Sequence, residues 1–576
     1  MNADRLLALY EKVAEAPDAV PRLRRFVLDL AVRGKLVPQD AGDEPASDLL
    51  KRIAAEKARL VKTRAIRKPR AVSPLDRGDL PFPAPRGWAW TQIAELGIIS
   101  PRNEADDTLE ASFVPMPMIA AEYGVANGHE PRPWGEIKKG YTHFAEGDVG
   151  LAKITPCFEN GKSTVFRNLT GGIGAGTTEL HVVRPLLVDA DYIVLFLKSP
   201  QFIETGIPRM TGTAGQKRVP TEYFTSSPFP LPPLAEQRRI VAKVEELMAL
   251  LDRLEAARTA RETTRDRLTA ASLTRLTALD TEPADFQAYA RFALATLPAI
   301  TTRPDQIKPL RQAILNLAVR GKLVEQDPTD EPASELLKRI AMHLEDQKNG
   351  RGRRAKPLPD VDPADAPFEL PEGWTWARFP ELGEFGRGKS KHRPRNDPAL
   401  YTSGTHLMIQ TGDVARSGGR IKTHTNKYND VGLAQSMLWP KGTLCITIAA
   451  NIADSGILDF DACFPDSVVG FVPAPGFENA RYFEYFVRTA KANLLEFAPA
   501  TAQKNINLEI LTSVLIPLPP LAEQHRIVAK VDALMALCDR LEAALTTADT
   551  TRARLLEALL ADALNPASMQ EMETAE

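Results

Sequence analysis

Two short polar motifs carry the side chains best suited to bind nucleic acid. Gln216-Lys217-Arg218 and Gln503-Lys504-Asn505 occupy matching positions 287 residues apart, inside segments that otherwise share little sequence. A side-chain amide offers a donor and an acceptor together, while Lys or Arg can bind a phosphate or the edge of a guanine. One such motif alone would equally fit a polar loop that leads into a strand. Its recurrence at the same offset favours contact with a nucleic-acid backbone or a role in positioning.

Clusters of cations elsewhere offer further candidates for phosphate contact. The second divergent segment carries five of them, Arg387, Lys389, Lys391, Arg393 and Arg395. Between Lys51 and Arg70, nine Lys or Arg accompany a single acid, and a matching run follows at Lys338, Arg339, Lys348, Arg351, Arg353, Arg354 and Lys356. These charges suit DNA electrostatically. A flexible surface loop or a solvated helix end has the same composition, so both interpretations stay open.

The sequence contains no recognisable catalytic centre. The spacing within 212–217 does not fit a phosphate-binding loop, and 171–176 does not fit a dinucleotide fingerprint. No Asn/Asp-Pro-Pro-Tyr/Phe element is present, so no segment matches the motif expected of an amino-methyltransferase active site. The histidines are isolated, and the four cysteines are scattered without metal-ligand spacing. We therefore expect no active site, no metal and no directly bound cofactor.

Composition indicates an ordinary soluble protein with several domains. Its 576 residues exceed what one core organises, and 44% hydrophobic with 25% charged residues is typical of globular chains. No apolar run reaches the roughly 18 residues of a membrane span, and no secretory signal opens the chain. A net charge of −2 excludes a general polycation signal for nucleic acid. We expect a cytoplasmic protein with reduced thiols and no membrane partner.

A duplicated framework surrounds the two divergent segments. Three motifs recur with the same offset: Leu-Ala-Val-Arg-Gly-Lys-Leu-Val at 30–37 and 317–324, Asp-Glu-Pro-Ala-Ser at 43–47 and 330–334, and Leu-Pro-Pro-Leu-Ala-Glu-Gln at 231–237 and 518–524. By contrast, the segments at roughly 98–225 and 385–512 share almost nothing. A duplicated scaffold with two different inserts is the organisation expected of a protein that reads two different things at a fixed separation.

Each Leu-Pro-Pro-Leu-Ala-Glu-Gln motif leads into a heptad pattern. Apolar residues recur at alternating spacings of four and three, at Ile240, Val244, Leu247, Leu251 and Leu254 and again at Ile527, Val531, Leu534, Cys538 and Leu541. Such a seam buries itself against another helix. No Pro or Gly interrupts 236–276, so one helix of roughly 60 Å can form there. The pattern favours a coiled coil over the core helix of a bundle.

The remaining framework motifs predict shorter helices. An apolar stripe occurs at Leu23, Val27 and Leu30 and again at Leu310, Ile314 and Leu317. Gly34 and Gly321 fall where a helix C-terminal glycine is expected, and 43–47 offers capping and first-turn residues for a second helix. In the middle of the chain, the long helix is followed directly by the short helices. The C-terminus carries a long helix alone, and the N-terminus carries the short helices alone. We therefore expect the termini to lie together and the molecule to have approximate two-fold symmetry.

Each divergent insert opens with a Trp-containing segment, at 85–90 or 371–376. Strand-like runs follow between Gly, Pro and Asn turns, at 181–183, 192–196, 444–448 and 468–472. We predict an α+β protein with two mixed α/β domains of about 150 residues, separated by long coiled-coil helices. The expected segments are a helical 1–80, a first domain at 81–233, a central helical region at 234–365, a second domain at 366–520 and a C-terminal helix at 521–576.

In these motifs and their order, the chain closely resembles the specificity subunits of type I restriction-modification systems. The resemblance rests on the repeated framework motifs, the heptad helices, the Gly-Trp pairs at 87–88 and 373–374, and the Gln-Lys pair of each insert, which together span nearly the whole chain. It implies two target-recognition domains in inverted orientation, separated by antiparallel helices. Each domain would read half of a bipartite, asymmetric DNA sequence, with the helices as a ruler for the gap.

The same resemblance implies partners rather than catalysis by this chain. They are double-stranded DNA, two copies of an adenine-N6 methyltransferase subunit, and ATP-dependent translocating endonuclease subunits; S-adenosylmethionine, ATP and Mg would be bound by those subunits. Two readers on one face of B-DNA should lie roughly 34 Å apart, which a rod of about 60 Å can span. A protein-binding scaffold with two adaptor domains would explain the framework but not the divergence of the inserts. A self-sufficient enzyme would need an active site that the sequence lacks.

Overall fold

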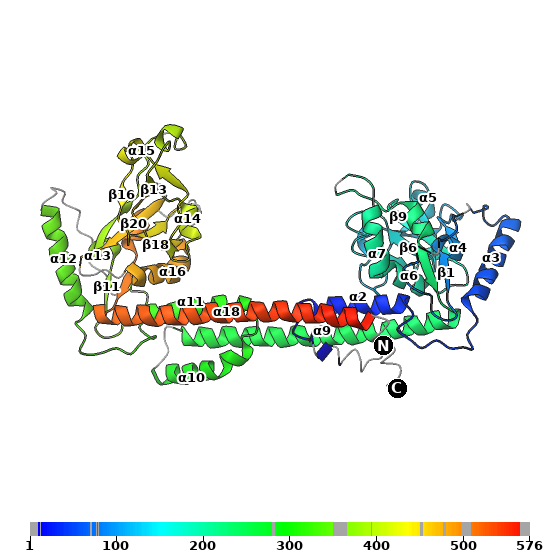
Figure 1. Cartoon of the computed structure of the whole chain (residues 1–576), viewed down its shortest axis with the longest axis horizontal. Coiled ribbons are helices and arrows are strands. Elements are labelled where there is room, and N and C mark those ends of the chain that lie inside the picture. The colour runs from blue at the N-terminus through cyan, green and yellow to red at the C-terminus, as the bar shows by residue number, and fades with distance from the viewer. Residues whose placement is uncertain are drawn as a thin grey trace. The chain divides into compact units, whose positions relative to one another are not determined.

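Two compact units make up the chain (Figure 1). The computed structural model describes residues 8–69, 72–213, 215–278, 283–349, 366–392, 394–449, 453–475, 480–496 and 508–564, except 9, 12, 77 and 79. Unit 1 consists of Met1–Arg261 with Ala548–Glu576, and unit 2 consists of Glu262–Thr547. Each unit therefore combines one insert with parts of both long helices.

Three helices form the framework of unit 1: α2 (Ala19–Val32), α3 (Ala46–Lys62) and the first part of α9 (Leu234–Leu276). The predicted seam of α9 is fully buried at 240, 244, 247 and 251, in one core with Leu23, Val27 and Leu30 of α2. Gly34 follows α2 with φ +67°, a left-handed conformation that suits glycine after a helix end. The seam of α9 thus packs on the short apolar helix that the repeated motif predicted.

The two ends of the described chain lie together in unit 1, as the order of the framework pieces predicted. Leu556 of α18 (Leu521–Leu564) packs with Val13, Ala16 and Ala19 in one buried cluster. The ammonium group of Lys35 donates to the carbonyl oxygen of Leu564 at 2.8 Å. The end of α18 therefore completes the framework of unit 1.

Unit 2 builds the same framework from continuous chain. Its helices are α11 (Ile307–Val319), α12 (Ala333–Asn349), the last part of α9 and the first part of α18. Ile527 and Val531 of the α18 seam are fully buried, and Cys538 is 3% exposed, in one core with Ile314 and Leu315 of α11. Lys322 donates to the carbonyl of Ala278 at 3.2 Å, the counterpart of the Lys35 contact. An additional helix, α10 (Pro283–Ile300), packs on the end of α9.

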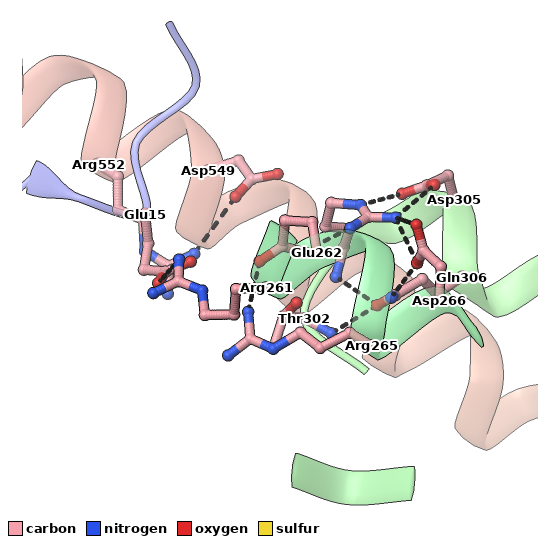
Figure 2. A network of polar contacts seen from close by, with 11 residues as sticks. Glu15, Arg261, Glu262, Arg265, Asp266, Thr302, Asp305, Gln306, Asp549 and Arg552 are labelled. Atoms are coloured by element: carbon pink, nitrogen blue, oxygen red, sulfur yellow. Dashed lines mark hydrogen bonds and ion pairs between the residues drawn. The ribbon is translucent and has the colours of Figure 1, made fainter. Parts of the chain in front are cut away.

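An ion-pair network ties the end of α9 to the start of α11 within unit 2. Arg303 lies 2.5 Å from Glu262 and 2.8 Å from Asp266, one turn further along α9. Gln306, in the short helix η5 (Pro304–Gln306), also donates to Asp266, at 3.0 Å (Figure 2). Its side-chain oxygen accepts the backbone N–H of Thr302 at 2.8 Å. The end of the connector that contains α10 is therefore held against α9 at Glu262 and Asp266.

The first insert contains two four-stranded sheets, ordered β2-β9-β6-β7 and β4-β3-β8-β5. Its strands are β2 (Gly97–Ile99), β3 (Glu110–Val114), β4 (Glu130–Pro133), β5 (Thr142–Ala145), β6 (Val149–Ala152), β7 (Ser163–Val165), β8 (Ile173–Gly176) and β9 (Leu180–Pro185). Its helices are α4 (Ile93–Leu96), α5 (Trp134–Ile137), α6 (Ala190–Lys198), α7 (Pro200–Gly206) and α8 (Thr221–Ser226). An antiparallel ribbon of β1 (Ala89–Gln92) and β10 (Pro228–Leu231) brings the two ends of the insert together.

The second insert has a different sheet topology, with five strands ordered β12-β20-β17-β18-β14 and four ordered β15-β13-β19-β16. The first sheet contains β12 (Gly383–Arg387), β14 (Arg420–Ile421), β17 (Leu444–Thr447), β18 (Ser455–Leu458) and β20 (Val468–Pro473). The second contains β13 (His406–Met408), β15 (Asn426–Tyr428), β16 (Leu438–Trp439) and β19 (Ala462–Cys463). The helices are α13 (Phe379–Leu382), α14 (Thr411–Ala415), α15 (Asp430–Ala434), α16 (Ala480–Glu496) and α17 (Leu508–Ser513). A ribbon of β11 (Thr375–Ala377) and β21 (Ile516–Leu518) again joins the ends of the insert.

Two local predictions are wrong. The run 192–196, predicted as a strand, lies in α6, whose first turn is capped because the side chain of Asp189 accepts the N–H groups of Asp191 and Tyr192. A short buried helix and a buried strand have the same apolar composition, so periodicity cannot separate them. The second concerns the 43–47 motif, since no side chain caps α3; Asp43 instead pairs with Arg239 at 2.6 Å. No described helix is both long and apolar enough to cross a membrane.

Candidate nucleic-acid interface

A buried tryptophan–glutamate pair joins the first insert to α9. The indole N–H of Trp88 donates to Glu236 Oε2 at 3.0 Å, and Gln39 donates to the other carboxylate oxygen at 3.3 Å. Glu236 is fully buried, and this burial raises the pKa of its carboxyl, against the opposing effect of the two hydrogen bonds. All three residues flank or belong to repeated motifs, so the motifs meet at one junction.

Three further bonds hold this junction. Tyr192 of α6 donates its hydroxyl to the carbonyl of Pro230 at 2.9 Å, and Gln237 donates to the carbonyl of Pro232 at 2.8 Å. The guanidinium of Arg239 pairs with the largely buried carboxylate of Asp43 at 2.6 Å. The insert, α3 and α9 are therefore locked to one another by polar bonds as well as by the apolar core.

The second insert repeats this construction. Trp374 donates to Glu523 at 3.0 Å, Gln326 donates to the other oxygen of Glu523 at 3.1 Å, and Arg526 pairs with Asp330 at 2.7 Å. Burial again raises the pKa of Glu523. The hydroxyl of Tyr482 donates to Pro517 O at 2.5 Å, and Gln524 donates to Pro519 O at 2.9 Å. In both units, the Leu-Pro-Pro-Leu-Ala-Glu-Gln motif thus anchors an insert to the long helix that follows it.

The predicted motif Gln216-Lys217-Arg218 lies on an anchored surface loop of unit 1. Arg218 exchanges two backbone hydrogen bonds with Thr211, at 2.8 and 3.0 Å, and the carbonyl of Lys217 accepts from Thr155 N at 2.9 Å. The side chains of Gln216 and Lys217 are exposed. Lys217 forms no ion pair with any described residue, which leaves its ammonium group available for a phosphate.

Arg218 differs from its neighbour because an acid already holds it. Its guanidinium makes three bonds of 2.8 to 3.1 Å to Glu179, and these bonds hold the pKa of Glu179 below its ordinary value. The imidazole of His181, in β9, bonds to the carbonyl of Val219 at 3.1 Å, and burial lowers the pKa of His181 to about 4. The loop is therefore held by a neutral imidazole and an Arg–Glu pair, with Lys217 exposed.

The counterpart motif and part of the basic cluster fall outside the described residues. These predicted contacts are Gln503, Lys504, Asn505 and Arg393. The rest of the cluster lies in unit 2: Arg387, Lys389, Lys391 and Arg395 are exposed. Arg395 pairs with Asp466 at 2.5 Å, whereas Lys389 and Lys391 form no ion pair with a described residue. Both inserts thus present exposed cations that form no ion pair with a described residue, each in its own unit.

Several cations of the longer basic runs pair with acids of the same helices. In α3, Lys51 pairs with Asp48 and Arg59 with Glu56, each three residues apart. In α12, Lys338 pairs with Glu335 at 2.7 Å. Lys57 is half-buried against the carbonyl of Ala94, and desolvation lowers its pKa to about 8. These pairs support the interpretation of the helical parts of the runs as solvated helix faces. The exposed Lys62, Arg64, Arg67 and Lys68 form no ion pair with a described residue, and Arg70 and 351–356 lie outside the described residues.

Sequence reasoning missed a set of polar residues in the second insert. Asn396, Gln410 and Asn426 line one pocket of about 440 Å³ together with Arg395. They come from different loops and strands, and their positions follow no spacing that a sequence motif could reveal. Only the neighbouring basic cluster pointed to this region.

Comparison with known proteins gives closely similar relatives. Residues 371–548 match the type I restriction modification DNA specificity domain. The chain is 40% identical over 566 residues to the type I restriction enzyme EcoEI specificity subunit of Escherichia coli, covering 95% of this chain and 94% of that protein. It is 37% identical over 559 residues to the EcoAI specificity subunit of the same species, with the same coverage. The crystal structure of the HsdS subunit from Thermoanaerobacter tengcongensis aligns with a TM-score of 0.46 at 20% identity, over 84% of this chain and 98% of that one.

Proposed function

The chain belongs to the family of type I restriction enzyme specificity subunits, and on that premise we propose that each of its inserts reads one half of a bipartite, asymmetric DNA target. It is a non-catalytic subunit that supplies DNA target recognition to a type I restriction-modification system. Its partners are accordingly DNA and the methyltransferase and endonuclease subunits of such a system. Two methyltransferase subunits would dock on it, and S-adenosylmethionine, ATP and Mg would be bound by the partner subunits.

The observation that carries this proposal is the sameness of the junctions beneath unlike inserts. Trp88–Glu236 and Trp374–Glu523 both measure 3.0 Å, although one insert has two four-stranded sheets and the other has five and four strands. If evolution conserved only the packing, the junction would not stay constant while the insert attached to it diverges. Two domains that recognise different DNA sequences need this combination of a constant junction and an exchangeable domain.

The exposed cations are the proposed backbone contacts. Lys217 in the first insert, and Lys389 and Lys391 in the second, would bind phosphates, because none forms an ion pair with a described residue. Gln216 would hydrogen-bond beside Lys217, and Gln503, Lys504 and Asn505 would act likewise in the second insert with Arg393. Arg218 and Arg395, each held by an acid, would contact DNA in a fixed orientation.

The long helices are the proposed ruler. We assign α9 and α18 to an antiparallel coiled-coil spacer that relates the recognition domains 81–233 and 366–520 by approximate two-fold symmetry, with 1–80, 234–365 and 521–576 as helical segments. Spacing on the DNA would then depend on helix length rather than on either insert. With this arrangement each domain can recognise its own base sequence, while the helices keep the distance between the two half-sites constant.

The test is a selection on the reconstituted complex. The chain is combined with its methyltransferase subunits and used to select duplexes from a random library at fixed salt. Enrichment of two base blocks with a constant gap supports the proposal. A chimera that carries a relative's 81–233 on the same framework should then change one block and keep the other. The absence of a bipartite motif would refute the proposal, as would a chimera that changes both blocks.

A further inference from the structure

The polar pocket of the second insert has the composition of a site for a planar polar ligand. Its volume is about 440 Å³, and its lining includes the amides of Asn396, Gln410 and Asn426, the hydroxyls of Thr411 and Ser467, and the guanidinium of Arg395. Three amides with one cation are unusual for a phosphate site, which needs several positive charges. Amides present a donor and an acceptor side by side, as the edge of a nucleobase does.

Two of these amides have no partner in the part of the protein that the structure describes. No hydrogen bond joins the side chain of Asn396 or Asn426 to another described residue. Asn426 is half-buried in β15, where its position is fixed by the pairing of its backbone with Met408 of β13. A half-buried amide on a paired strand loses less entropy than one on an unpaired loop when it binds a ligand, and its hydrogen-bonding capacity is not used by any described residue.

The neighbouring basic loop is pinned at several points. Gly388 donates its N–H to Val468 O at 2.9 Å, and a Cβ at this position would lie 2.2 Å from the carbonyl oxygen of Phe464. Further along, the side-chain oxygen of Gln435 accepts the N–H of Lys391 at 2.7 Å, and Tyr401 donates its hydroxyl to Arg395 O at 2.6 Å. Lys389 and Lys391 therefore extend from an ordered loop next to the pocket.

Arg395 is oriented at the pocket by an acid. Asp466 accepts from one terminal nitrogen of its guanidinium at 2.5 Å, while the side chain stays 45% exposed. One carboxylate contact leaves the other N–H donors of the guanidinium for a ligand, and it restricts the rotation of the side chain. An arginine fixed in this way can select an acceptor pair such as guanine N7 and O6.

We propose that this pocket is the base-reading site of the second recognition domain and that it takes the edge of a purine in its half-site. Lys389 and Lys391 bind the flanking phosphates, while Asn426, Asn396 and Arg395 hydrogen-bond to the base edge. Purines fit because N7 offers an acceptor beside either the N6 amino group of adenine or O6 of guanine. The inference rests on the proposed function, because it names the residues that give the second half-site its sequence.

The experiment compares Asn426→Ala with Lys389→Ala in the reconstituted methyltransferase complex. Each complex binds duplexes in which every position of both selected half-sites is varied, and the salt dependence is recorded. Asn426→Ala should lose roughly 5- to 100-fold discrimination at one or two adjacent positions of one half-site, with an unchanged salt slope. Lys389→Ala should weaken all sequences alike and lower the slope. Gln312→Ala, which removes an exposed amide of α11, is the matched control that should change neither.

The outcomes separate the two proposals. If the wild-type complex selects no bipartite motif, the proposed function fails. If it selects one, the pocket is excluded when Asn426→Ala keeps full discrimination in both half-sites. The pocket is also excluded when this variant loses affinity for all sequences alike with a smaller salt slope, since that is the behaviour of a phosphate contact. Should Asn426→Ala melt at a lower temperature, Asn396→Ala, an exposed residue of the same pocket, replaces it in the comparison.

Discussion

The indole N–H of Trp88 donates to the fully buried carboxylate of Glu236 at 3.0 Å, and this bond links residues that are 148 positions apart. Trp88 immediately precedes β1, and Glu236 lies in the first turn of α9. The bond therefore fixes where the insert begins relative to the helix that follows it. Because β1 pairs with β10, which leads directly into α9, the position of the whole insert depends on this junction.

Replacing Trp88 by Phe should destabilise unit 1 by about 1–3 kcal/mol, because the buried carboxylate of Glu236 keeps the donor Gln39 but loses the indole donor without gaining water. Trp90→Phe is a matched control, since the indole nitrogen of Trp90 is buried and has no hydrogen-bond partner among the described residues. The measurement is chemical denaturation of the full chain. Equal free energies of unfolding for the two variants would mean that the Trp88 bond contributes nothing beyond ring packing.

The second insert contains a buried acid that predicts a pH-dependent stability. Glu484 of α16 is fully buried between Arg481 at 3.3 Å and Arg488 at 2.5 Å. Desolvation raises the pKa of Glu484 to about 7, against the opposing effect of the two arginines. Between the ordinary value of 4.5 and about 7, the folded state therefore binds more protons than the unfolded state. Stability should fall as pH rises through this window, by at most about 1.4 kcal/mol per pH unit.

Glu484→Gln tests this dependence. The variant should lose that part of the slope between pH 5 and 7, whatever its absolute stability, since Gln does not titrate. Denaturation at pH 5, 6, 7 and 8 measures it, with the exposed Glu335→Gln as the control that should keep the wild-type slope. An unchanged slope in Glu484→Gln would assign the pH dependence to other groups. In the first insert Val194 stands at the equivalent place, two residues after Tyr192 as Glu484 is after Tyr482, so the effect should be confined to unit 2.

The framework of the fold was predictable because its residues are local and repeated. Heptad spacing identified the seam at 240–251, and Gly34 marked the end of a helix. The run 192–196 was not predictable as a helix, because its apolar residues fit either structure and the deciding feature is the cap by Asp189. The pocket residues were not predictable for a different reason. Asn426 reaches the pocket only because β15 pairs with β13, a contact that no sequence spacing encodes.

The structure separates two residues that the sequence motif grouped together. Lys217→Ala should lower the salt slope of DNA binding by about 0.9, the contribution of one phosphate contact. Arg218→Ala should lower it less, because Glu179 already neutralises the guanidinium through three bonds. Glu179→Gln releases that arginine and should steepen the slope. Binding of the reconstituted complex is measured between 50 and 200 mM salt. If all three variants keep the salt slope of the wild-type complex, this loop is not part of the interface.

The ruler proposal predicts how the gap responds to helix length. Seven residues inserted after Arg258 in α9, and seven after Leu545 in α18, preserve the heptad phase and lie outside the buried seams at 240–251 and 527–538. An added heptad lengthens a helix by about 10 Å, which corresponds to about three base pairs of B-DNA. Library selection should therefore return the same two base blocks with a gap about three base pairs longer. Because five inserted residues turn the apolar face by about 140°, an insertion of that length should abolish selection. The same gap with altered bases would contradict the proposal, since helix length would then act on the readers and not on their separation.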